Sequence, residues 1–126
     1  MRLRVFPQRF AVCRLPKGAD AEAVASVAGE FVAVVRTADE VSVVCEEDQA
    51  PPGSRVEGGW RLLRVAGTLD FTQVGVLAAL CVPLAEAAIS IFAVSTFDTD
   101  YLMLKEANLR SAIEALQKAG HDFEVG

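Results

Sequence analysis

Hydrophobic and polar positions from residue 60 to the C-terminus follow two alternating patterns. Short apolar runs rich in β-branched and aromatic residues indicate strands, and longer runs with apolar positions three and four residues apart indicate helices. The predicted order is strand, helix, strand, strand, helix, strand, over residues 60–66, 74–87, 89–94, 101–104, 107–119 and 122–125. This order is typical of an α+β ferredoxin-like βαββαβ sandwich.

The second of these helices has the clearest pattern. Leu109, Ala112, Ile113 and Leu116 follow the i, i+3, i+4, i+7 spacing of one apolar face. Gly120 stands where a left-handed residue commonly ends a helix. We therefore expect an amphipathic helix that stops at this glycine.

Pro83 lies inside the first predicted helix, residues 74–87, and removes one backbone donor there. Either the helix bends before Pro83, or it ends early and restarts; periodicity does not separate the two. His121 follows Gly120 and is expected at the surface.

In the N-terminal half the same kind of pattern predicts a strand, a short helix and a hairpin of two strands, over residues 9–15, 21–28, 31–35 and 41–45. Residues 46–59 turn acidic and then carry Pro51-Pro52 and Gly58-Gly59. Because proline and glycine break helices, we expect a loop there.

A weak internal repeat relates the two halves. Residues 31–46 resemble residues 89–106: each has an apolar strand, a Thr-x-Asp turn and a second apolar strand ending in an acidic residue. This pattern predicts two units in tandem, residues 1–59 as a degenerate βαββ unit and residues 60–126 as a complete βαββαβ unit. Chance similarity between two hairpins is the alternative.

Composition and charge narrow the classes of partner. The chain is 52% hydrophobic with a formal net charge of −5, and no block of Lys or Arg stands out. Phosphate binding needs concentrated positive charge, so nucleic acid and anionic membranes are not expected partners. The longest uncharged stretch, residues 71–85, is shorter than the roughly 20 residues that cross a bilayer. With no apolar signal-peptide region, we expect a cytoplasmic protein.

The three cysteines, Cys13, Cys45 and Cys81, lie far apart in apolar runs and form no CxxC motif. They are expected to be reduced, buried side chains. No metal and no cofactor is expected. The only histidine has no adjacent Ser or Cys motif, and the chain has no phosphate-binding glycine motif. We therefore do not expect an enzyme.

A polar corner, residues 95–100, separates the two central strands of the C-terminal half. It carries two carboxylates and three hydroxyls where a hairpin needs only a turn. The free amides of a helix starting near Val74 suit a carboxylate, and Gly75 would let a ligand approach them. Asp70 or Asp100 could accept an ammonium group. The corner and this helix start together suit a free amino acid.

Structural roles for the same residues stay open. Asp70 could cap the helix that begins near Thr72. Asp100 could only shape the turn, and Ser95 and Thr96 could satisfy backbone groups at a strand end.

Residues 69–78 and 84–103, with the sequence Ser-Thr-Phe-x-Thr-Asp-Tyr at 95–101, resemble the small bacterial ACT-domain proteins. They also resemble the ACT modules of a eukaryotic cytosolic arginine sensor. The resemblance covers the C-terminal half, whereas the N-terminal half resembles a degenerate first ACT unit more loosely. Its loop at residues 16–20 lacks the Asp-Phe-x-x-x-Gly sequence of residues 70–75.

This resemblance implies a regulatory domain that binds a small molecule, most often an amino acid, at an interface between ACT units, usually in a homodimer. Carried over residue by residue, it gives these candidate ligand-binding residues: Thr68, Leu69, Asp70, Phe71, Val74, Gly75, Ser95, Thr96, Thr99 and Asp100. The alternative is a protein-interaction or dimerisation module without a ligand, using exposed strand edges.

Overall fold

The computed structural model describes residues 1–19, 21–66 and 75–124 of the chain. The chain divides into two compact units. The larger unit combines Met1–Pro7 with Arg61–Gly126, and the smaller unit is Gln8–Trp60. Strands β1 (Arg2–Pro16) and β4 (Arg55–Val65) each contribute residues to both units. The predicted boundary between residues 59 and 60 stays a prediction.

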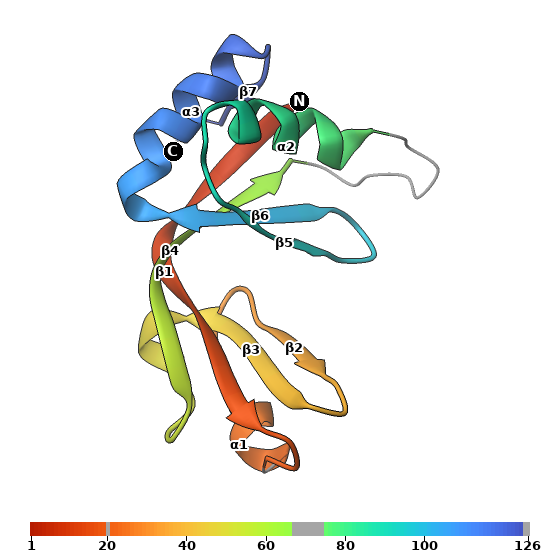
Figure 1. Ribbon diagram of the computed structural model, residues 1–126, viewed down its shortest axis with the longest axis vertical. Helices are drawn as coiled ribbons and strands as arrows, with labels where there is room; N and C mark the ends of the chain where they lie inside the picture. The colour runs from red at the N-terminus through yellow and green to blue at the C-terminus, as the bar shows by residue number, and fades with distance from the viewer. Residues whose placement is uncertain (20, 67–74, 125–126) are drawn as a thin grey trace. The chain divides into compact units, whose positions relative to one another are not determined.

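The larger unit is an α+β layer of one sheet and two helices (Figure 1). After β4 its elements are α2 (Val76–Glu86), β5 (Phe92–Ser95), β6 (Asp100–Lys105), the 3₁₀ turn η2 (Glu106–Asn108), α3 (Leu109–Lys118) and β7 (Asp122–Phe123). The order of its strands is β7-β1-β4-β6-β5. Strands β5 and β6 are antiparallel, and β7 pairs in parallel with the start of β1.

Helices α2 and α3 lie on the same face of this sheet (Figure 1). The side chains between them and the sheet form one apolar core: Leu3, Leu63, Val65, Leu80, Leu84, Ile89, Leu102, Leu104, Ala112 and Leu116. Leu63 and Val65 alternate along β4, and Leu102 and Leu104 along β6, as the two-residue period of strands requires. Ala112 and Leu116 come from the predicted apolar face of α3.

The smaller unit contains the rest of β1, α1 (Ala21–Ala25), β2 (Ala33–Arg36), β3 (Glu40–Glu46), the 3₁₀ turn η1 (Glu47–Gln49) and the start of β4. Strand β3 pairs antiparallel with both β1 and β2. Cys13 and Cys45 are free and fully buried in its core, as expected. Burial, with the nearby Cys13, Asp48 and Glu46, raises the pKa of the Cys45 thiol to about 12.

The element order predicted from residue 60 onward is confirmed, and β2 and β3 confirm the N-terminal hairpin. The loop expected over residues 46–59 is wrong in part, because β4 begins at Arg55. Its first residues are exposed on both faces and so carry no alternating pattern. The Glu47 carboxylate holds this segment by accepting the Gly59 N–H at 2.9 Å.

Pro83 does not interrupt α2, which runs without a break from Val76 to Glu86. The missing proline N–H would have donated to the carbonyl of Ala79, four residues earlier. His121 Nε2 lies 3.0 Å from this carbonyl oxygen and supplies the donor instead. The expectation that His121 lies at the surface is therefore wrong: it is 7% exposed because it completes the hydrogen bonding of α2.

Candidate functional site

The polar corner between β5 and β6 is a closed turn held by its own hydroxyls. The Thr96 N–H donates to the carbonyl of Thr99 at 2.9 Å. The Thr96 hydroxyl donates to the same carbonyl and accepts the Thr99 N–H at 3.3 Å. Thr96 therefore has the structural role that the sequence left open for it, which is to satisfy backbone groups at a strand end.

Thr99 anchors this corner to the end of β4. Its hydroxyl donates to the carbonyl of Val65 at 3.1 Å, and the residue is only 3% exposed. Val65 is the last residue of β4, so the corner lies beside the point where the chain leaves this strand for α2. Among the candidate residues, Thr99 therefore positions the corner, through a contact with a residue 34 positions earlier in the sequence.

Asp100 lies two residues before Leu102 and four before Leu104 in β6, so it shares the face of the sheet that carries the helices. Ser95 is its partner across the two strands, and the Ser95 hydroxyl donates to Asp100 Oδ1 at 2.6 Å. Burial, and secondly the charge of Asp100, raise the pKa of the Cys81 thiol on α2. Asp100 is therefore close enough to α2 for its charge to act on a side chain of that helix.

Gly75 immediately precedes α2 and has φ of +79°, a backbone conformation that other residues rarely adopt. A Cβ added there would meet nothing within 4 Å, so the approach to this backbone is open among the described residues. The Gly75 carbonyl accepts the Ala79 N–H at 2.9 Å, which closes the first turn of the helix. The amides of the residues between them lie at the positive end of α2.

Half of the candidate residues lie outside the part of the chain that the structure describes: Thr68, Leu69, Asp70, Phe71 and Val74. The described candidates fall on two elements, the start of α2 and the corner of the β5–β6 hairpin. The charge of Asp100 contributes to the raised pKa of Cys81, which lies on α2 six residues after Gly75. Six helical residues span about 9 Å along the helix axis.

Sequence reasoning missed Cys81, which it treated as buried. The structure leaves this thiol partly exposed on α2 and within reach of the Asp100 charge. The sequence carried no signal for this exposure, because α2 is apolar throughout and its pattern does not show which side stays open.

Two further properties bear on the chemistry of the described residues. No group of three or more His, Cys, Asp or Glu side chains is placed to hold a metal ion within residues 1–19, 21–66 and 75–124. No helix in these same ranges is both long enough and apolar enough to cross a membrane.

Comparison with known proteins gives partial matches to curated sequences. Over 60 residues the chain is 40% identical to the human cytosolic arginine sensor for mTORC1 subunit 1. The match covers 47% of this chain and 18% of that protein, so the chain spans less than a fifth of the relative's length.

Solved structures match over nearly the whole chain. A protein from Agrobacterium tumefaciens is 33% identical, with a TM-score of 0.89, over 99% of this chain and 92% of that one. The regulatory subunit of aspartate kinase from Thermus thermophilus has a TM-score of 0.69 at 10% identity, over 94% and 96% of the two chains. At this identity the second likeness concerns the fold alone.

Two family models match successive parts of the chain. One, described as an N-terminal domain, matches residues 8–53. The other, the model of the ACT domain, matches residues 55–118 and thus half of the chain, including the hairpin corner and both helices of the larger unit. The chain belongs to the ACT-domain family.

Proposed function

We propose that this protein is a cytoplasmic regulator that binds an amino acid without catalysing a reaction. The ligand lies where the β5–β6 corner meets the start of α2. One observation carries this proposal: the Thr99 hydroxyl is bonded to the end of β4, which places the corner beside the point where the chain leaves this strand for α2. These two elements flank the segment that holds the remaining candidate residues.

The chemistry of this corner suits the two charges of an amino acid. One carboxylate oxygen of Asp100 accepts a hydrogen bond from the Ser95 hydroxyl, and we assign the other oxygen to the ligand ammonium. The first amides of α2, past Gly75, donate to the ligand carboxylate, as helix N-termini commonly do for anions. We propose that Thr68, Leu69, Asp70, Phe71 and Val74 complete the site from the connecting loop.

The relatives support a regulatory role. The curated relative is a cytosolic arginine sensor. We extend amino-acid sensing from this protein to this chain, and we propose in addition that the chain assembles as a homodimer. We also propose that the smaller unit is a degenerate ACT-like unit, so that the chain holds two such units in tandem.

A second candidate function is a protein-interaction module without a ligand. It is favoured by strand β2, whose Val34 and Val35 are 44% and 56% exposed. An exposed apolar strand at a sheet edge can pair with another chain. Such a module would use β2 and would leave the hairpin corner without a ligand.

Thermal unfolding in the presence of each common amino acid separates these functions. A ligand at roughly 100 times its dissociation constant adds about 2.7 kcal/mol to the free energy of unfolding. We expect one amino acid, or a small group of them, to raise the melting temperature. If none does so at millimolar concentration, the sensor function is wrong.

Asp100→Asn tests the site itself. The substitution keeps a hydrogen-bonding side chain and removes the charge that pairs with the ammonium. A hydrogen bond to a charged group contributes about 1.5–3 kcal/mol, so the affinity should fall by roughly 10- to 150-fold. Asp98→Asn is the matched control, because Asp98 is an exposed carboxylate on the same turn. Equal losses in both variants would contradict the assigned role of Asp100.

A further inference from the structure

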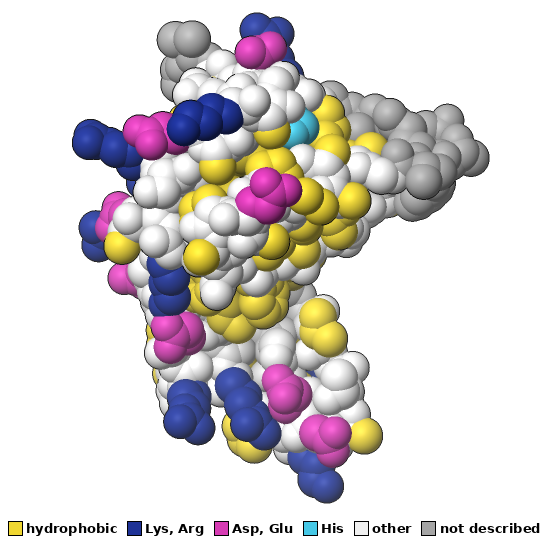
Figure 2. All heavy atoms as spheres, turned by 45° about the horizontal axis from the view of Figure 1, so that its top comes forward, with side chains coloured by type: hydrophobic (Ala, Val, Ile, Leu, Met, Phe, Trp, Pro, Cys, Tyr) yellow, Lys and Arg dark blue, Asp and Glu magenta, His cyan; other side chains and the backbone are white. Residues whose placement is uncertain are grey.

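Helix α2 has an apolar outer face. No charged or polar side chain occurs in it before Glu86. Val82 is 53% exposed, and Ala78, Ala79 and Ala85 are exposed as well. Figure 2, in which the helices of the larger unit are turned toward the viewer, shows hydrophobic side chains gathered in an area with few charges. A helix that is apolar on all sides is usually covered on all sides.

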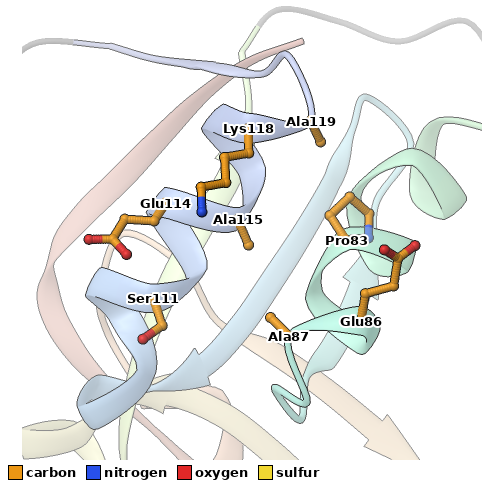
Figure 3. Close-up of a pocket in the computed structure, with 8 residues that line it drawn as sticks. All are labelled: Pro83, Glu86, Ala87, Ser111, Glu114, Ala115, Lys118 and Ala119. Carbon is orange, nitrogen blue, oxygen red and sulfur yellow. The ribbon is translucent and has the colours of Figure 1, made fainter.

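A groove of about 490 Å³ runs between α2 and α3 next to this face (Figure 3). Small side chains form part of its lining, Pro83 and Ala87 on the α2 side and Ser111, Ala115 and Ala119 on the α3 side, and the charged Glu86, Glu114 and Lys118 complete it. Small side chains let another helix come close, because the distance between packed helices depends on the side chains at the contact. The groove therefore fits a helix surface with one protruding apolar residue, and Val82 is such a residue.

Three charged residues line the groove, and two of opposite sign, Glu86 and Lys118, belong to its two ends. The two helices run in opposite directions along it, so that Ala87 and Ser111 lie at one end and Ala119 at the other (Figure 3). The backbone of Glu86 lies near the first end and that of Lys118 near the second, and both side chains point back along the groove (Figure 3). A two-fold axis through the middle of the groove exchanges these ends. It would place Glu86 of one copy over Lys118 of the other, twice.

We propose that this face, made of the outer side of α2 and the α2–α3 groove, is the surface on which two copies of this chain pair. Each copy seats Val82 in the groove of the other, and Glu86 of each pairs with Lys118 of the second copy. The proposal names the surface of the homodimer proposed above and does not depend on a bound amino acid.

Sedimentation velocity over a range of protein concentrations tests the surface. We expect the wild type to sediment as a dimer of twice the 13.5 kDa chain mass. Val82→Glu should weaken dimerisation by about tenfold or more, because each copy then buries a carboxylate in a groove that already carries Glu86 and Glu114. Val35→Glu is the matched control, since it changes a similarly exposed valine on β2. A monomeric wild type, or dissociation by Val35→Glu alone, would overturn the proposal.

A charge exchange tests the two-fold arrangement. Glu86→Lys and Lys118→Glu should each weaken the homodimer, because each variant brings like charges together at both ends. When the two variants are mixed, both ends regain opposite charges, so a heterodimer should form more tightly than either homodimer. No effect within a single chain can produce this result. A mixture that associates no better than the separate variants would contradict the arrangement.

Thermal melts of the separate variants show whether each is folded before mixing. A dimer on this surface with no thermal shift from any amino acid would contradict the sensor function and leave the surface standing. A thermal shift with a monomeric wild type would support the sensor function and contradict the proposed dimer surface.

Discussion

At the scale of single residues, Pro83 and His121 work as a pair. Proline removes the donor that the Ala79 carbonyl would receive inside α2, and His121 Nε2 supplies another at 3.0 Å. The two residues lie 38 positions apart in sequence, so neither one predicts the other. The Gly120 turn brings them together, because it directs the chain after α3 back toward α2.

His121→Ala should cost about 1–3 kcal/mol of stability, since it leaves the Ala79 carbonyl without this donor. In a Pro83→Ala background the new N–H of residue 83 can donate to the same carbonyl, so the cost of His121→Ala should be smaller. Urea unfolding of the wild type, both single variants and the double variant measures this coupling. Additive costs would show that His121 stabilises the protein in some other way.

Ala88 and Gly120 occupy equivalent positions after α2 and α3. At each helix end the left-handed residue and the one after it donate back to the last turn. Ala88 has φ of +58° and Gly120 has φ of +95°. The fold therefore uses an alanine at one helix end where it uses glycine at the other.

Ala88→Gly should stabilise the protein by about 0.5–1 kcal/mol, because glycine adopts this conformation without the steric cost that alanine carries. Gly120→Ala, the reciprocal change, should destabilise it by about 1 kcal/mol or more. The midpoints of urea unfolding give both values. Two shifts of the same sign would contradict this explanation.

At the scale of elements, the sequence predicted what depends on local pattern. The apolar spacing of α3 and its glycine stop are found as expected, with α3 at Leu109–Lys118. The first residues of β4 were missed because their side chains are exposed and a carboxylate from Glu47 holds the backbone. Pattern reasoning detects burial, and this segment is not buried.

The candidate site, too, could be predicted from the sequence only in part. The hydroxyls and carboxylates of the hairpin corner could be found from the sequence, since a turn with so many polar groups is unusual. The bond from Thr99 to Val65 could not, because it joins two elements that pattern reasoning treats separately. Cys81 was missed because an apolar helix gives no sign of which side stays open.

Cys81 can report on the corner. A bound amino acid at Asp100 should slow the reaction of this thiol with a thiol reagent, while Cys13 and Cys45 stay buried and unreactive in the folded protein. Mass spectrometry of the labelled chain measures the rate for Cys81. Burial and the Asp100 charge raise the Cys81 pKa, so Asp100→Asn should lower that pKa and speed the reaction. Asp98→Asn should change the rate much less, and equal changes would contradict the contact.

At the scale of the whole molecule, the larger unit is made from two separated segments. Strand β7 pairs with β1 at Arg2–Asp122 and Leu3–Phe123. Leu3 is 1% exposed and belongs to the same core as Leu116. The sequence could not show this arrangement, because β1 is a single strand whose two ends serve different cores. Leu3 serves one, and Ala11 serves the other.

A chain that joins residues 1–7 directly to residues 61–126 should therefore fold by itself. Strands β1 and β4 are neighbours, and the Arg61 side chain donates to the Phe6 carbonyl at 2.9 Å, so a short turn containing glycine can connect them. A chain of residues 60–126 alone should be less stable by about 2–5 kcal/mol or should not fold, because it leaves β7 without its partner and removes Leu3 from the core. Thermal unfolding followed by circular dichroism compares the two. Equal cooperative unfolding of both chains would mean that residues 60–126 form a complete unit and that β1 only lies beside it.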